Sequence, residues 1–95
     1  ATLEDHLLQI GAACRARGIR LVVLSYPFAH PRLEDVQRRA AARLGAPFVF
    51  VRERFDHELT TKAWDDLFVK NGHCNDAGYA IVAEMAAAAV ADALK

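Results

Sequence analysis

Apolar residues recur at helical spacing in some parts of the chain and form continuous runs in others, and the changes between these patterns mark the predicted elements. Behind Thr2, apolar side chains return every three or four residues, as they do on one face of a helix. These side chains are Leu3, Leu7, Ile10 and Cys14. Thr2 and Asp5 have the spacing of a capping box, and Gly18 supplies a left-handed stop. The first element is therefore predicted to be a capped helix that ends before Gly18.

Two later stretches lack helical spacing and are predicted to be strands. "IRLVVLSYP" (residues 19–27) and "APFVFV" (residues 46–51) are apolar without alternation, which is typical of parallel strands covered by helices on both faces. Between them, "PRLEDVQRRAAARLG" (residues 31–45) has one apolar face and a glycine stop at Gly45. The apolar positions of that helix are Leu33, Val36, Ala40 and Leu44. This strand–helix–strand unit is expected to form a right-handed parallel pair.

The last third of the chain predicts one more helix. Residues 52–69 have a mixed pattern, with a single helical turn expected around residues 63–67. Asn75 or Asp76 can cap the final helix, whose inward face is expected to carry Ile81, Val82, Met85, Ala89 and Val90. Residues 1–95 then form a single α/β segment. Because two parallel strands leave apolar faces and backbone edges uncovered, we expect half of a doubly wound unit, completed by another polypeptide or a second copy.

Charge and cysteine content exclude several classes of partner. Twelve basic and twelve acidic residues cancel, so neither a nucleic acid nor an anionic membrane is expected to bind. No apolar run approaches the ~20 residues that span a bilayer, so no membrane span is expected. Cys14 and Cys74 fit neither a zinc site nor a CxxC redox motif, and Cys14 is predicted to be a buried small apolar residue. No metal site and no cofactor are expected.

The candidate chemistry gathers where the predicted strands end. In open parallel sheets, ligands bind at the carboxyl ends of the strands. Ser25, Tyr26 and His30 follow the first strand, residues 52–55 follow the second, and the loop that carries His73 is expected to reach the same rim. Ser25 is the only serine, but it lacks the Gly-x-Ser-x-Gly elbow that exposes an attacking hydroxyl, so a structural role is favoured.

One stretch is specific enough to suggest a family. "NGHCNDAGYAIVAEM" (residues 71–85) resembles the last conserved block of the SGNH/GDSL hydrolases, in which an Asp, a short spacer and a His precede a polar pair, a glycine and a helix. The run "GIRLVVLSYPFAHP…LGAPFVFV" is similar to the family's penultimate strand, helix and last strand. The resemblance covers nearly the whole chain but only the carboxyl-terminal half of the family's domain. It implies a three-layer α/β/α, flavodoxin-like, doubly wound parallel sheet and hydrolysis of esters, often acyl or acetyl groups on carbohydrates or lipids.

The resemblance also assigns roles to individual residues. It implies that His73 is the base that deprotonates a serine and later protonates the leaving alcohol, with that serine and the oxyanion hole supplied by a segment outside the chain. Lys70 and Asn71 occupy the places where the family has its Asp. Asn71 can accept a hydrogen bond from the imidazole but brings no charge, and Asp65 or Asp66 is the alternative orienting group. The other possible functions are a non-catalytic interaction module of the same descent and a self-associating structural domain.

Overall fold

The computed structural model describes residues 2–95, and helices account for most of them. The bounds of the elements, in chain order, are α1 Leu3–Ala16, β1 Val23–Leu24, α2 Pro31–Leu44, β2 Phe48–Val49, α3 Val51–Glu58, the short 3₁₀ helix η1 Trp64–Asp66 and α4 Asp76–Ala93. The order of the predicted elements is therefore present, with α3 added between the second strand and the turn around η1.

The expected three-layer, flavodoxin-like, doubly wound sheet is wrong. Within residues 2–95 the only sheet has two strands of two residues each, and the structure is mostly helical. The two strands do pair in parallel, as predicted, with Val23 opposite Phe48 and Leu24 opposite Val49. The strands are shorter than the apolar stretches 19–27 and 46–51 because a strand needs hydrogen bonds to a neighbouring backbone. The two stretches face each other over only a few residues.

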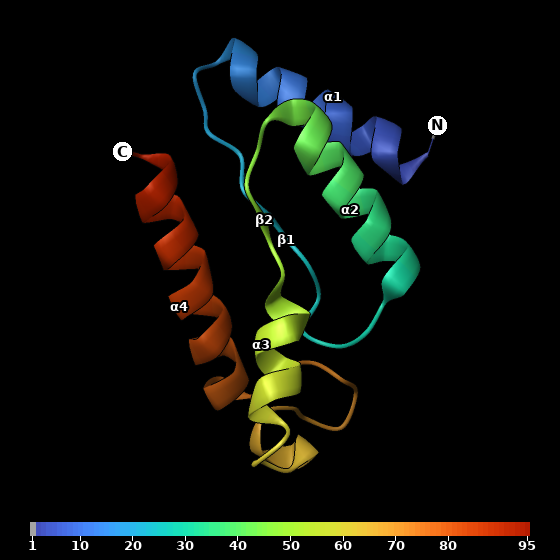
Figure 1. The fold of residues 1–95 in the computed structure, drawn as a ribbon, viewed down its shortest axis with the longest axis vertical. Coiled ribbons are helices and arrows are strands. Elements are labelled where there is room, and N and C mark those ends of the chain that lie inside the picture. Colours follow the sequence, from blue (N-terminus) through green and yellow to red (C-terminus); the bar gives the residue numbers. More distant parts are fainter. Residues whose placement is uncertain (1) are drawn as a thin grey trace.

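The helices lie on both sides of the strand pair. Helix α2 contacts both strands, α4 contacts β2 on the other side, and α1 packs against α2 (Figure 1). The molecule measures 42 × 32 × 18 Å. The backbone N–H groups of Val23 and Ser25 donate to the carbonyls of Pro47 and Val49, each at 3.0 Å. Because N–H directions alternate along a strand, the backbone groups of Leu24 face away from β2 and form an open edge.

The predicted helix ends are confirmed where local signals specify them. Thr2 Oγ1 accepts a hydrogen bond from Asp5 N at 3.2 Å, and Thr2 N donates to the Asp5 carboxylate at 3.1 Å. Gly45 ends α2 with a φ of 65°, in the left-handed region that glycine adopts without strain. Asn75 rather than Asp76 caps α4, since Asn75 Oδ1 accepts from Gly78 N at 2.9 Å.

Sequence patterns failed at α3 and on two helix faces. Val51 reads as the end of a strand but begins a helix, in which Val51 and Phe55 lie one turn apart and are fully buried. On α1, Ile10 is 51% exposed and Cys14 is only half-buried, because α1 packs mainly against α2. On α4, Val90 is 46% exposed rather than inward-facing. These apolar side chains are exposed because the fold has few layers to cover them.

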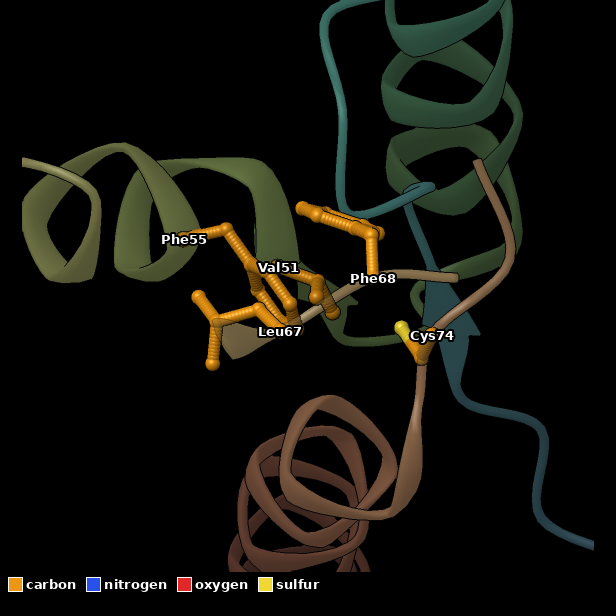
Figure 2. Packing of buried hydrophobic residues seen from close by; sticks show 5 residues of the cluster. All are labelled: Val51, Phe55, Leu67, Phe68 and Cys74. Carbon is orange, nitrogen blue, oxygen red and sulfur yellow. The ribbon is translucent and has the colours of Figure 1, made fainter. Parts of the chain in front are cut away.

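The largest buried cluster lies between α3 and the start of α4. It consists of Val51, Phe55, Leu67, Phe68 and Cys74 (Figure 2). The rings of Phe55 and Phe68 are 5.5 Å apart, and Trp64 stacks on Phe68 at 4.0 Å. Residues of β1, β2 and α4 pack around this cluster. The chain is therefore anchored in the core on both sides of residues 69–73, and the loop formed by these residues carries His73.

Candidate functional site: a groove at the carboxyl end of β1

A tight loop presents His73. Val69 N donates to His73 O at 2.8 Å and Gly72 N to Val69 O at 3.1 Å, while Phe68 and Cys74 form an antiparallel bridge at the base of the loop. Gly72 has a φ of 80°, which favours glycine at this reversal. The backbone at His73 is thus held on both sides, although its side chain is exposed.

Asn75 ties this loop to two neighbouring elements. In addition to capping α4, its side-chain amide donates to Asp65 O at 3.2 Å, and its backbone N–H donates to Leu67 O at 2.9 Å. Helix α4 begins very close to the preceding segment. A Cβ built on Gly78 would lie only 2.3 Å from Leu67 O. Only glycine allows this approach, which places the start of α4 and the His73 loop together.

The loop and the segment after β1 line one groove of about 680 Å³. Its walls are residues 24–28, residues 71–74, His30, Tyr79 and Val82. The structure therefore brings Ser25, Tyr26, His30 and His73 to the same place at the carboxyl end of β1. Residues 52–55, which were expected at the same rim, do not line the groove.

The predicted orienting groups of His73 are not bonded to it. Asn71 and His73 both line the groove, but among the described residues neither side chain makes a hydrogen bond. The carboxylate of Asp66 accepts a hydrogen bond from Ala63 N at 2.9 Å, and neither Asp65 nor Asp66 lines the groove. The imidazole at the groove thus lacks an orienting carboxylate from residues 2–95.

The two possible nucleophiles in the groove wall are both buried. Ser25 is 6% exposed, and its hydroxyl donates to Tyr26 O at 3.2 Å and accepts from Arg52 N at 3.3 Å in the first turn of α3. The structural role favoured for Ser25 fits these contacts. Cys74 is 7% exposed, and burial raises the pKa of its thiol. The unreactive thiol therefore predominates at neutral pH.

A buried ion pair that the sequence did not reveal links α2 to α3. Glu34 is 3% exposed, and its two carboxylate oxygens accept from Arg52 Nε at 2.6 Å and Arg52 Nη2 at 3.0 Å. The hydrogen bonds from Arg52 hold the pKa of Glu34 below its usual value. Arg52 also donates to Asp56 at 2.8 Å. Eighteen positions separate Glu34 from Arg52, so no local spacing signals the pair, which serves to fix α3 under the groove wall.

A second hollow of about 420 Å³ lies at the amino ends of the strands. Arg15 Nη2 donates to Leu44 O at 2.9 Å, and Arg20 donates to Ala93 O. These carbonyls end α2 and α4, where positive charge is favourable. The arginines of this hollow are therefore engaged in capping helices, so the groove with His73 is the better candidate for a ligand site.

Neither the described residues nor a comparison with known proteins adds an assignment to this site. Residues 2–95 contain no group of three or more His, Cys, Asp or Glu side chains arranged to hold a metal ion. None of the helices in that range has the length and apolar character needed to cross a membrane. The sequence matches no protein-family model, no curated protein and no solved structure.

Proposed function

We propose that this chain is the carboxyl-terminal portion of an SGNH-type ester hydrolase and supplies the histidine base of its site. The observation that carries this proposal is the groove, in which the exposed imidazole of His73 shares a wall with the carboxyl end of β1. The imidazole of His73 makes no hydrogen bond to the described residues, so both ring nitrogens are available for proton transfer. The substrate is an ester of a small molecule, a lipid or an acylated carbohydrate.

The nucleophile of the proposed reaction lies outside residues 1–95, because the hydroxyl of Ser25 is buried and bonded to the backbone. His73 takes the proton of the external serine as the serine oxygen bonds to the ester carbonyl carbon. It returns that proton to the alkoxide oxygen as the ester C–O bond breaks. A water molecule, deprotonated in turn by His73, then releases the acid and restores the serine.

The open edges of the strand pair suggest how the nucleophile arrives. The backbone groups of Leu24 face away from β2, and an unpaired edge favours the addition of another strand. We infer that a strand from an amino-terminal segment, or from a second copy of the chain, pairs there. Size-exclusion chromatography of the isolated 95-residue chain tests this inference. Self-association is expected, and a stable monomer that unfolds cooperatively would count against it.

The catalytic proposal is tested with p-nitrophenyl acetate on the native polypeptide that carries this chain. His73→Ala is expected to lower kcat/KM by about 10²- to 10⁴-fold, as for loss of a general base. Ser25→Ala is expected to retain turnover, and a fluorophosphonate is expected to label a serine outside residues 1–95. Turnover that survives His73→Ala, or a label on Ser25, would overturn the assignment.

A second candidate, a non-catalytic binding module of the same descent, is favoured because no carboxylate of residues 2–95 lines the groove or bonds to the imidazole of His73. Asn71→Asp separates the two candidates. In an enzyme, a carboxylate at this position favours the protonated imidazole of the transition state, so the rate should rise, whereas Asn71→Ala should not raise it. A binding module shows no turnover in any of these variants.

A further inference from the structure

The groove beside His73 has an aromatic wall. Tyr26 and Phe28 stack with their ring planes 4° apart and their centroids at 5.7 Å, and His30 lies 6.2 Å from Tyr26 at a tilt of 42°. Tyr79, from the first turn of α4, lines the same groove. Tyr26 is 51% exposed and Tyr79 is 55% exposed. Both tyrosines are thus about half exposed, so part of each side chain remains open to a ligand.

The groove carries no fixed charge. Of its lining residues within the described part of the chain, none is a Lys, Arg, Asp or Glu. A charged ligand would lose its hydration on entering without gaining a counter-charge. The polar groups at hand, such as Asn71 and the two tyrosine hydroxyls, can donate and accept single hydrogen bonds. This combination suits an uncharged ring with a polar substituent.

We infer that the groove is a subsite for an uncharged aromatic ring, held against Tyr26 and Tyr79 with its carbonyl substituent toward His73. The preference for an aromatic over a saturated ring comes from ring–ring contacts, which add to the burial of apolar area common to both. The inference rests on the proposed function for one point, namely that the ring belongs to the ester substrate. Binding of the ring itself needs no catalysis.

The test is an NMR titration of the native protein with two neutral ketones that cannot be hydrolysed. Acetophenone and cyclohexyl methyl ketone have the same carbon connectivity, and only the first has an aromatic ring. Acetophenone is expected to bind more tightly by about two- to tenfold for each ring–ring contact that it makes. Equal affinity for the two ketones would overturn the inference.

Matched variants locate the site. Tyr26→Leu and Tyr79→Leu keep apolar volume but remove a ring, and each is expected to reduce the preference for acetophenone, whereas Tyr26→Phe should keep it. Leu94→Ala, at a side chain 67% exposed outside the groove, should change nothing. A preference that persists in both leucine variants would also overturn the inference. Ring binding without p-nitrophenyl acetate turnover would contradict only the proposed catalysis, and turnover without ring preference would contradict only the subsite.

Discussion

Two hollows lie at opposite ends of the strand pair, and their polar side chains have different uses. At the amino ends, Arg15 and Arg20 donate to the last carbonyls of α2 and α4. At the carboxyl end of β1, Asn71, His73 and Tyr79 line the groove, and none of these side chains makes a hydrogen bond within residues 2–95. Polar groups that already have partners stabilise the fold, while those without partners remain free to bind a ligand.

The supports beneath the two hollows also differ. The α1–α2 end is held by small buried residues, Ala40 and Ala41, and by exposed pairs of Glu4 with arginines of α2. The groove end rests on the cluster around Phe55, which joins α3, the segment after η1 and the start of α4 (Figure 2). The free imidazole therefore lies on the better packed part of the molecule, as a binding site requires.

Glycine-to-alanine substitutions at the two ends should give the largest contrast. In Gly78→Ala, the new Cβ meets Leu67 O at 2.3 Å, and since this atom is backbone, α4 must move, at a cost of about 1–3 kcal/mol. In Gly11→Ala, the Cβ meets the Leu44 side chain at 2.4 Å. Leu44 lines the hollow and can rotate, while alanine favours the helix by up to about 1 kcal/mol. Urea unfolding followed by circular dichroism measures both.

The same two glycine variants also show whether the conformation of the groove changes. Gly78→Ala should shift the amide resonances of Val69 and His73, and Gly11→Ala should leave them unchanged. Equal losses of stability in the two variants would show that the groove end is no more tightly constrained than the other.

The next largest effect is expected at Asn75, which joins the loop to α4 and η1. Asn75→Ala removes the cap on Gly78 N, which typically costs about 1 kcal/mol of unfolding free energy. Asn75→Asp keeps an acceptor for Gly78 N but loses the amide that donates to Asp65 O. The aspartate variant should therefore retain most of the stability while the loop exchanges its amide hydrogens faster. If both variants lose the same stability, the cap is not the dominant contact.

A smaller difference in the free energy of unfolding is expected between a variant of Arg15 and a variant of His73. Arg15→Met keeps the apolar stem but loses the hydrogen bond to Leu44 O, at a cost of about 0.5–1 kcal/mol. His73→Ala removes a side chain without a partner, so the free energy of unfolding should change by less than about 0.5 kcal/mol. Thermal unfolding of both variants checks this order. A large loss in His73→Ala would mean that the imidazole is structural, which would weaken the case for catalysis.

Local signals in the sequence predicted the parts of the fold that depend on them. The capping box at Thr2, the stop at Gly45 and the cap at Asn75 all form as expected, because each involves residues within a few positions of one another. Helix α3 was missed because Val51 continues an apolar run, and only Phe55, one turn later, signals the helix. The large sheet was wrong because strand pairing depends on neighbours outside any local window.

The candidate site was predictable only in outline. The rule that ligands gather at the carboxyl ends of parallel strands placed Ser25 and His73 near one another, and the groove contains both. Spacing along the chain could not show that Asn71 makes no hydrogen bond to His73. Nor could it show that Glu34 pairs with Arg52, eighteen positions away, because such contacts depend on how helices pack.

The smallest expected effect is electrostatic and compares Glu58 of α3 with Glu4 of α1. Hydrogen bonds from Lys62 and then Arg54 lower the pKa of Glu58 to about 2 from its ordinary 4.5, and Arg43 likewise lowers the pKa of Glu4. A lowered folded pKa gives stability that is full above about pH 4.5 and is lost as the pH falls toward 2. Glu58→Gln should therefore flatten the fall of Tm between pH 5 and 2 more than Glu4→Gln does.

Both electrostatic effects should shrink in 0.5 M salt, because these carboxylates lie near solvent and their pairs are screened. Tm measured against pH in low and high salt tests this point. An equal slope in the wild type and in Glu58→Gln would show that the ion pairs of Glu58 with Arg54 and Lys62 do not stabilise the fold. In that case the apolar cluster around Phe55 and the buried pair of Glu34 with Arg52 hold α3 without help from Glu58.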